Sequence, residues 1–281
     1  MKRFQLTLMA LLLSVCLFAQ DLQRVTNISY RPKDKALREQ CVLDIIKPQN
    51  AKDMPVVVWF HGGGLTMADR NYMPKGVLDT NYIVVTVDYR LLKGDNTLDN
   101  CIDDAAASVA WVFDNISKYG GDPSKIVLSG HSAGAYLSNM IGLDKKWLAK
   151  YGKDPDNLLA LIPFSGQVIS HFAYRKQLGM SALQPSIDIY APLYYVRPDA
   201  PPIVIITADR EKELYGRYEE DAYFYRMLKL VGHPNVWLYE LGGYTHVNMD
   251  EPACQILKDH LNKLLGKPDA YDFQQMYVNQ M

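Results

Sequence analysis

The stretch that decides the fold is IVLSGHSAGAY, residues 126–136. It begins with an apolar run over 126–129, places Ser132 between Gly130 and Gly134, and then continues as a helix-like segment. A strand that enters a helix through so short a turn strains the serine backbone and exposes its hydroxyl, while small neighbours leave room for adjacent backbone. The following helix N-terminus favours developing negative charge. The pattern predicts that Ser132 is a nucleophile rather than part of a plain turn.

Eight segments have the composition of β-strands. Two segments near the N-terminus alternate polar and apolar residues, which indicates an antiparallel pair of half-buried strands. The others are near-continuous apolar runs, most of them rich in Val and Ile, as expected for strands buried on both faces of a parallel sheet. The predicted strands cover 25–30 and 41–46 for the pair, then 55–60, 82–87, 125–129, 158–164, 202–207 and 235–241.

Helical patterns separate these strands. Apolar residues recur at steps of three and four from Leu98 to Ile116, and Gly120–Gly121 would end that helix. Two more helices are predicted over 217–230 and 252–265. The fold class is therefore α/β: a mostly parallel, twisted, eight-stranded sheet with helices on both faces and antiparallel strands at its N-terminal edge.

The domain organisation follows from the two ends of the chain. Residues 1–19 have a basic start, an apolar run too short to form a stable membrane span, and a small residue, Ala19, which predicts a signal peptide cleaved near that position. We therefore expect a secreted or periplasmic protein, with lipid attachment at Cys16 as an alternative to soluble export. Residues 20–281 are expected to form a single domain, in which 167–200 is either a small lid or a packed loop.

Composition excludes several function classes. The formal net charge is −1, and no basic tract points to a nucleic-acid partner. Cys41, Cys101 and Cys254 are too widely spaced for a zinc site or a disulfide framework. We expect no metal and no cofactor.

A serine hydroxyl needs a general base, and His246 is the best placed of the six histidines. It follows the last predicted strand, behind Gly242–Gly243, in a loop that could reach Ser132. The other histidines lie in glycine-rich motifs, in the 167–200 segment, near a helix end or on the last predicted helix.

The base in turn needs a carboxylate that fixes its tautomer. The stretch after the penultimate strand supplies Asp209, Glu211 and Glu213. Aspartate is the commoner residue in such triads, which favours Asp209, although Asp209 could instead cap its own turn. The residues alone leave Asp209 and Glu211 as alternatives.

The glycine run His61–Gly62–Gly63–Gly64 closes the first buried strand. Bare backbone brings N–H groups close to an oxyanion without side-chain clashes. We expect the N–H groups of Gly63, Gly64 and Ala133 to form an oxyanion hole. A phosphate-binding loop is excluded because no Lys-Ser/Thr pair follows the glycines.

With HGGG at 61–64, GHSAG at 130–134, an acid after the next-to-last strand and His246 after the last, the chain resembles the α/β-hydrolase fold. It is most similar to the esterase/lipase branch with an HGGG oxyanion loop, which VDYRL (87–91) and the stretch 101–134 also match. In that family the acid falls four residues after the strand-end pair. The resemblance therefore implies Glu211 rather than Asp209.

Two departures narrow the implied function. His131 stands where lipase-like members often carry Asp, which is similar to feruloyl/acetyl-carbohydrate esterases and arylformamidases. The helical cap of larger lipases is missing, which argues against long-chain fats. The resemblance implies a serine carboxylesterase acting on small short-chain acyl or aryl esters, including acylated carbohydrate. The alternatives are an amide or formamide hydrolase with the same triad, and a non-catalytic ligand-binding homologue.

Overall fold

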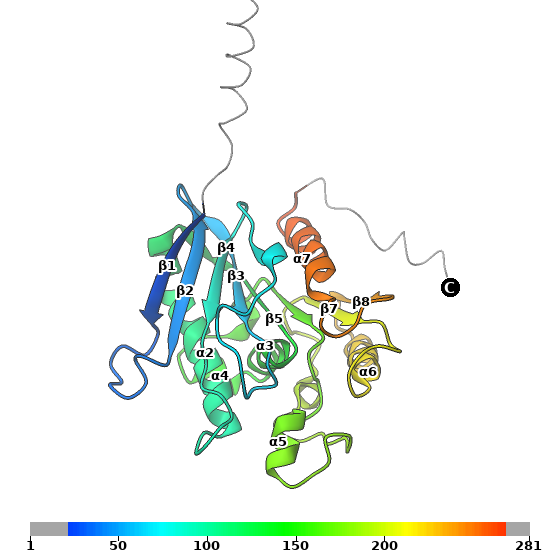
Figure 1. Ribbon diagram of the computed structural model, residues 1–281. Coiled ribbons are helices and arrows are strands. Elements are labelled where there is room, and N and C mark those ends of the chain that lie inside the picture. The colour runs from blue at the N-terminus through cyan, green and yellow to red at the C-terminus, as the bar shows by residue number, and fades with distance from the viewer. Residues whose placement is uncertain (1–21, 268–281) are drawn as a thin grey trace, which may run out of the picture.

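The structure is a computed structural model that describes residues 22–267. The predicted signal peptide lies outside these residues. The strands form one eight-stranded sheet in the order β1-β2-β4-β3-β5-β6-β7-β8 (Figure 1). The β1–β2 and β2–β4 pairs are antiparallel and all other pairs are parallel, which confirms the predicted fold class. The strands are β1 (Leu22–Ser29), β2 (Val42–Pro48), β3 (Met54–Phe60), β4 (Ile83–Val87), β5 (Gly121–His131), β6 (Ala160–Phe164), β7 (Ile203–Ala208) and β8 (Val236–Leu241).

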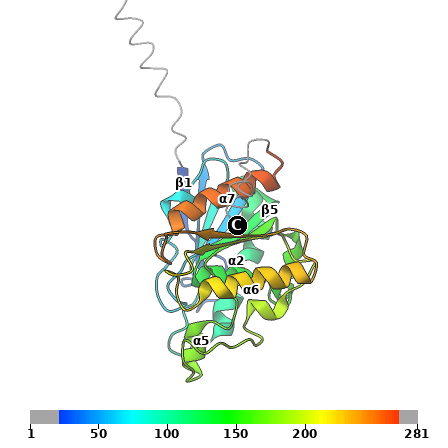
Figure 2. The same ribbon diagram turned by 90° about the vertical axis from the view of Figure 1, so that its right-hand side faces the viewer.

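Helices cover both faces of the sheet. Helices α2, α3 and α6 contribute to the hydrophobic cluster on one face, and α7 to the cluster on the other. Figure 2 shows α7 on one side of the sheet, with α2 and α6 on the opposite side. The helices are α2 (Leu98–Asn115), α3 (Ala133–Leu143), α4 (Lys146–Ala149), α5 (Phe172–Gln177), α6 (Arg217–Leu230) and α7 (Asp250–Leu264), with the short 3₁₀ helices η1 (Lys75–Val77), η2 (Ile116–Tyr119), η3 (Pro155–Asn157) and η4 (Pro192–Tyr195).

The central strand β3 is apolar throughout because both of its faces are covered. Val56 and Val58 pack into the cluster under α2 and α3, whereas Val57 and Trp59 pack into the cluster under α7. Successive side chains of a strand point to opposite faces, so a strand covered on both sides must be apolar at every position. Each fully buried valine contributes roughly 1.5–3 kcal/mol to stability.

Helix α2 begins and ends where its sequence dictates. The backbone N–H of Thr97 donates to Asn100 Oδ1 at 3.0 Å, and the N–H of Asn100 donates back to Thr97 Oγ1 at 3.4 Å, which forms a capping box. The helical path continues through η2 to Gly120, which adopts φ 86°. A glycine in this left-handed conformation ends a helix without steric cost.

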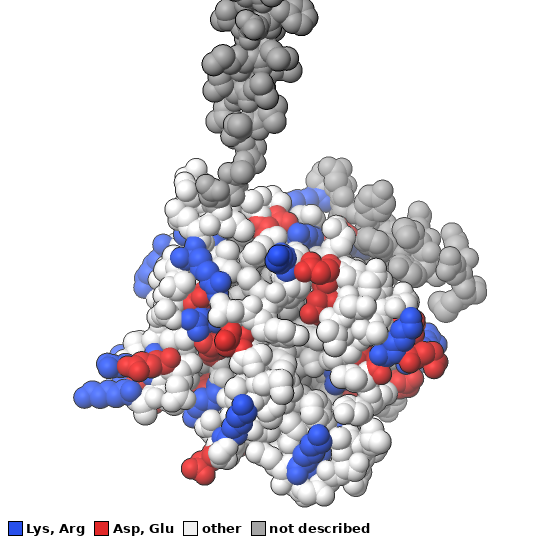
Figure 3. All heavy atoms as spheres, viewed as in Figure 1, with Lys and Arg blue, Asp and Glu red and all other residues white. Residues whose placement is uncertain are grey.

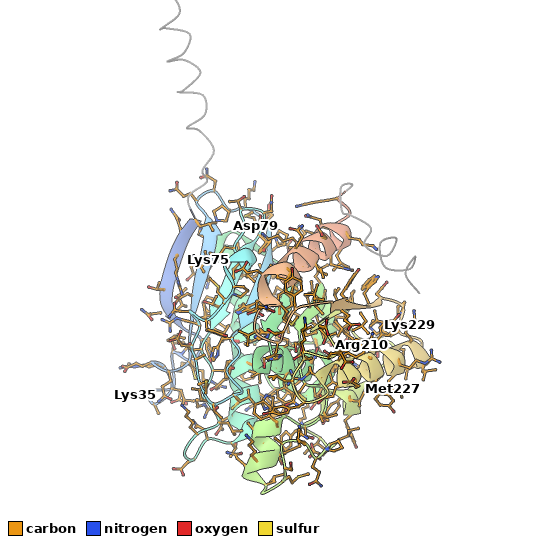
Figure 4. All side chains as sticks on the ribbon, turned by 45° about the vertical axis from the view of Figure 1, so that its right-hand side comes forward. Lys35, Lys75, Asp79, Arg210, Met227 and Lys229 are labelled. Atoms are coloured by element: carbon orange, nitrogen blue, oxygen red, sulfur yellow. The ribbon has the colours of Figure 1, made fainter. Side chains whose placement is uncertain are left out.

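Helix α7 is tied to the segment around η1. The backbone N–H groups of Lys75 and Gly76 donate to the carboxylate of Glu251 at 2.8 and 2.9 Å, and Asp79 pairs with Lys258 at 3.1 Å. Figure 4 shows Lys75 and Asp79 beside α7. These contacts fix the helix that directly follows the loop of His246.

The 167–200 segment lies beyond the carboxyl ends of the central strands, where Figure 1 places α5 below the sheet. It is tied down by polar contacts: Tyr136 donates from its hydroxyl to the carbonyl of Tyr190 at 2.8 Å, and Ser170 Oγ donates to Asp188 at 2.7 Å. Movement of this segment as a lid stays a prediction.

The molecular surface carries charges of both signs. On the face seen in Figure 3, basic and acidic side chains are interspersed, without a large area of one sign. Among residues 22–267, no helix is both long and apolar enough to cross a bilayer.

Candidate active site

Ser132 lies at the turn between β5 and α3 in a strained backbone conformation. Its φ is 54° and its ψ is −112°, a region that non-glycine residues seldom adopt. The neighbouring strand β6 stabilises this conformation, because the Ser132 N–H donates to the carbonyl of Phe164 at 2.8 Å. Strain of this kind persists only where surrounding structure enforces it, and it is common at active sites. The strained turn that the sequence predicts is therefore present, and the role of Ser132 as a nucleophile stays a prediction.

The two flanking glycines are required by the approach of β3. A Cβ atom at Gly130 would lie 2.4 Å from the carbonyl oxygen of Phe60, and one at Gly134 would lie 1.9 Å from the same atom. Any side chain at either position would therefore push the turn away from β3. The close approach of β3 therefore requires glycine on both sides of Ser132, which accounts for the GxSxG spacing.

The glycine-rich loop lies beside this turn. A Cβ at Gly62 would lie 3.2 Å from the carbonyl oxygen of His131, the residue before Ser132. Gly63 and Gly64 adopt φ of 96° and 61°, and the Gly63 carbonyl accepts from Met67 N at 3.1 Å. As the first residue of α3, Ala133 has an N–H that no carbonyl within the helix can accept. The role of these three N–H groups in an oxyanion hole stays a prediction.

His246 reaches the same end of the sheet. It follows β8 and lies before α7, and it is only 7% exposed. Its backbone carbonyl accepts from His131 Nε2 at 2.8 Å, and the two imidazole rings are 4.6 Å apart between centroids. The loop of the predicted base therefore lies against His131, the residue directly before the predicted nucleophile.

The carboxylate that contacts His246 is Glu213. His246 Nδ1 lies 2.6 Å from Glu213 Oε1, and the Glu213 side chain is 1% exposed. The prediction that Asp209 or Glu211, with Glu211 preferred, would hold His246 is therefore corrected by this contact. Glu213 belongs to the same acidic stretch, two residues further along the chain.

The turn after β7 explains the correction. The Asp209 side chain accepts from the N–H groups of Glu211 and Gly243 at 3.0 and 2.6 Å, so Asp209 ties two loops together and caps its own turn. The Asp209 carbonyl accepts from Glu213 N at 2.9 Å, which brings Glu213 back beneath the end of β7. Glu211 is left exposed on the outside of that turn.

Arg210 marks the outer side of the same turn. It pairs with Glu240 at 2.6 Å and donates to the Tyr218 hydroxyl at 2.8 Å. Figure 4 shows Arg210 near α6. The side chains at 209–211 are thus engaged away from His246 or exposed, while Glu213 is buried against it.

Ser165 is a site residue that the sequence reasoning missed. It follows β6 as Ser132 follows β5, with φ 50° and full burial. Its hydroxyl donates to Glu213 Oε2 at 2.8 Å, and its Oγ lies 3.0 Å from His246 Nδ1. The signal was present in the sequence as Phe164–Ser165–Gly166, a small polar turn directly after a buried strand.

The surroundings of Glu213 keep it ionised. Burial alone would raise the pKa of Glu213, but the hydrogen bond and charge of His246, with the Leu214 N–H and the Ser165 hydroxyl, outweigh burial and lower the pKa to about 2. An ionised carboxylate at Nδ1 fixes the proton on that nitrogen and leaves Nε2 as the basic atom. The pair has the electrostatics that a general base requires.

The described part of the chain offers no metal centre. Within residues 22–267, no group of three or more His, Cys, Asp or Glu side chains is arranged to hold a metal ion. Cys41, Cys101 and Cys254 are buried free thiols.

Comparison with known proteins identifies the family of this chain. The sequence profile of the BD-FAE family matches residues 43–215 of the 281-residue chain. The chain belongs to the BD-FAE family. The match covers the sheet from β2 through β7, including the turn of Ser132 and the acidic stretch with Glu213.

Two curated proteins to which this BD-FAE member is similar are named as esterases. Cocaine esterase of Oryctolagus cuniculus is 32% identical over 50% of this chain and 29% of its own length. Liver carboxylesterase B-1 of Rattus norvegicus is 36% identical over 43% of this chain and 25% of its own length. The chain thus spans less than a third of the length of these two relatives.

Solved structures share the fold over nearly the whole chain. Esterase 2 of Thermogutta terrifontis, phosphoramylated by tabun, superposes with a TM-score of 0.67 at 21% identity, covering 89% of this chain and 97% of that one. A truncated carbohydrate esterase from gut microbiota superposes with a TM-score of 0.69 at 16% identity, covering 89% and 98%. At these identities the likeness establishes the α/β-hydrolase fold.

Proposed function

We propose that this BD-FAE protein is a serine carboxylesterase in which Ser132 is the nucleophile, His246 the general base and Glu213 the acid. One observation carries the proposal: the strained Ser132 turn lies beside a histidine whose Nδ1 is held by a buried carboxylate at 2.6 Å. The esterase names of the curated relatives support the same reaction class.

The reaction proceeds through an acyl-enzyme. Ser132 Oγ attacks the ester carbonyl carbon while His246 Nε2 takes the hydroxyl proton, and the carbonyl oxygen becomes an oxyanion held by the N–H groups of Gly63, Gly64 and Ala133. The C–O bond then breaks, and His246 returns the proton to the leaving alcohol. Water repeats the sequence and releases the acid and the free serine.

The surroundings of the glycine loop favour short acyl or aryl groups. A Cβ at Gly64 would meet Phe172 Cζ at 3.0 Å, so this ring lies directly against the loop, and Tyr215 packs 5.9 Å from it between centroids. In the proposed function, these aromatic rings would pack against a flat or short group bound beside the reacting carbonyl. A relative of the same fold, Thermogutta terrifontis Est2, has been solved with butyrate bound.

The alcohol side of the substrate is proposed to be a carbohydrate, and the protein to act after export. The carbohydrate esterase among the structural relatives supports the first point. The basic start at Lys2 and Arg3 and the apolar run over 6–18 support the second. The proposed reaction then needs a small ester and water, and it involves no nucleic acid and no cofactor.

The test is a series of p-nitrophenyl esters from acetate to octanoate, with Ser132→Ala as the control. We expect kcat/KM to fall as the acyl chain lengthens, and Ser132→Ala to lose at least roughly three orders of magnitude in kcat. Wild-type turnover by Ser132→Ala would overturn the mechanism, and a preference for octanoate would overturn the substrate class.

A further inference from the structure

The side chain of His131 lies where three parts of the site meet. It stands directly before Ser132 and is 4% exposed. Its Nε2 lies 2.8 Å from the carbonyl oxygen of His246, and a Cβ at Gly62 would lie 3.4 Å from its Nδ1. Its Nε2 is also 3.4 Å from Asp250 Oδ1, at the start of α7. One imidazole thus lies between the nucleophile turn, the glycine loop, the main chain of His246 and the start of α7.

The hydrogen bond fixes which nitrogen of His131 carries the proton. A carbonyl oxygen can only accept, so Nε2 must be the donor. Burial lowers the pKa of His131 to about 3, and the neighbouring His246 acts in the same direction, so the ring is neutral. Its Nδ1 finds no hydrogen-bond partner among the described residues. His131 is therefore a neutral donor directed at the main chain of His246.

The side chain and the main chain of His246 are held by different groups. Its imidazole is held by Glu213 and Ser165, and its carbonyl by His131. Before His246 the loop is tied to the turn after β7, because the Gly243 N–H donates to Asp209 Oδ2 at 2.6 Å and the Asp209 N–H donates to the carbonyl of Tyr244 at 3.1 Å. The bonds from Thr245 onward are local, between Thr245 and Asn248 and between the Met249 N–H and the carbonyl of Thr245. Val247, the next residue along the chain, is 70% exposed, so little packing restrains the main chain directly after His246.

We propose that His131 is a positioning residue, which holds the main chain of His246 through its Nε2–H group and thereby fixes the imidazole of His246 relative to Ser132. The inference rests on the proposed function, since it assigns His131 a part in the same reaction. It accounts for a histidine at this position in place of a residue that would only fill space. Misplacement of a catalytic group by about 1 Å costs about a hundredfold in rate.

The experiment compares His131→Leu with His131→Gln. Leucine removes the donor, whereas the amide nitrogen of glutamine can occupy the place of Nε2 and donate to the same carbonyl. We expect His131→Leu to lower kcat about a hundredfold with KM changed less than about threefold, and His131→Gln to restore kcat to within about tenfold of wild type.

The matched control is His233→Leu. His233 is also buried, and its Nε2 also contacts backbone carbonyls, those of Ala200 and Pro201 at 3.0 and 3.2 Å. These carbonyls precede β7, at the opposite end of the sheet from Ser132. We expect His233→Leu to lose stability, measured as a thermal midpoint, and to keep the wild-type kcat.

A second readout needs no activity. Amide hydrogen exchange over residues 242–249 should speed up in His131→Leu and stay unchanged in His233→Leu. Wild-type kcat in His131→Leu, a kcat for His131→Gln as low as that of His131→Leu, or unchanged exchange in this loop would overturn the inference. Failure of the proposed function would show itself separately, as an inactive wild-type protein or a fully active Ser132→Ala.

Discussion

The most informative single change is Glu213→Gln, because the structure specifies how its carboxylate is used. The two carboxylate oxygens accept four hydrogen bonds, from His246 Nδ1 at 2.6 Å, Leu214 N at 2.7 Å, Ser165 Oγ at 2.8 Å and Ala208 N at 3.2 Å. An amide replaces one acceptor by a donor. Whichever way the glutamine amide turns, its NH₂ group faces one of two pairs of donors. These are His246 Nδ1 with Leu214 N, or Ser165 Oγ with Ala208 N, and the NH₂ group cannot accept their hydrogen bonds.

Both orientations of the new amide in Glu213→Gln impair the reaction. If the NH₂ faces His246, the imidazole must place its proton on Nε2, and it can no longer take the proton of Ser132. If the oxygen faces His246, the tautomer is kept, but the Ala208 N–H loses its acceptor at a cost of about 1–3 kcal/mol. In either case the imidazolium that forms in the reaction loses its counter-charge.

The expected loss in kcat is about 10³–10⁴-fold, because removal of the negative charge from a triad acid has an effect of this size. This equals roughly 4–5.5 kcal/mol of barrier at 1.36 kcal/mol per tenfold. KM should change little, since Glu213 does not face the substrate. The assay is steady-state hydrolysis of p-nitrophenyl acetate, with active enzyme counted by titration.

The same change should alter stability in a defined pH range. The pKa of Glu213 is lowered from 4.5 to about 2 in the folded protein, so its ionised form stabilises the fold above pH 4.5, and this stability is lost as the pH falls from 4.5 to about 2. The shift corresponds to at most about 3 kcal/mol. Wild type and Glu213→Gln should therefore differ most in unfolding free energy near neutral pH and converge near pH 2.

The control is Glu211→Gln, an exposed carboxylate of the same stretch, which should keep kcat within about twofold of wild type. Asp209→Asn should weaken the turn but leave the carboxylate at His246 in place. A steep loss in Glu211→Gln or Asp209→Asn, with Glu213→Gln near wild type, would refute the assignment of the acid.

Three other features of the structure can be tested by single substitutions. Ser165→Ala removes the hydroxyl at 3.0 Å from His246 Nδ1 and should lower kcat about 10–100-fold at unchanged KM; a KM effect alone would contradict a role at His246. Burial raises the pKa of Asp250 to about 7, so the folded state loses stability as the pH rises from 3.8 to 7. Asp250→Asn should therefore raise the thermal midpoint at pH 8 but not at pH 3.5. An equal gain at both pH values would contradict this reasoning. Gly134→Ala would place a Cβ 1.9 Å from the Phe60 oxygen and should yield little folded protein, so a stable, fully active variant would show that the turn can shift.

The parts of the site that could be predicted from sequence are those set by local chain geometry. Apolar runs revealed the strands, and the glycines on either side of Ser132 revealed the turn, because their spacing is imposed by the approach of Phe60 on the neighbouring strand. His246 could be predicted because its position after the last strand restricts where its loop can lie. In each case the constraint acts within a few residues or between adjacent strands.

The acid could not be predicted, because several carboxylates follow the same strand. Hydrogen bonds within the turn decide which of them returns to the sheet: Asp209 is used as the cap, and its carbonyl binds the N–H of Glu213. Ser165 was missed for a related reason. Its contacts with Glu213 and His246 depend on the pairing of β6 with β7 and of β7 with β8, which brings three strand ends together, and no motif within one segment encodes that pairing.

The central claim is that Ser132 is an activated nucleophile, and its most direct test is covalent labelling with a fluorophosphonate followed by mass spectrometry of the modified peptide. The account predicts one label per chain, on Ser132, formed much more slowly in His246→Ala and in Glu213→Gln. Absence of labelling in the folded wild-type protein, or a label on another serine such as Ser165, would contradict it.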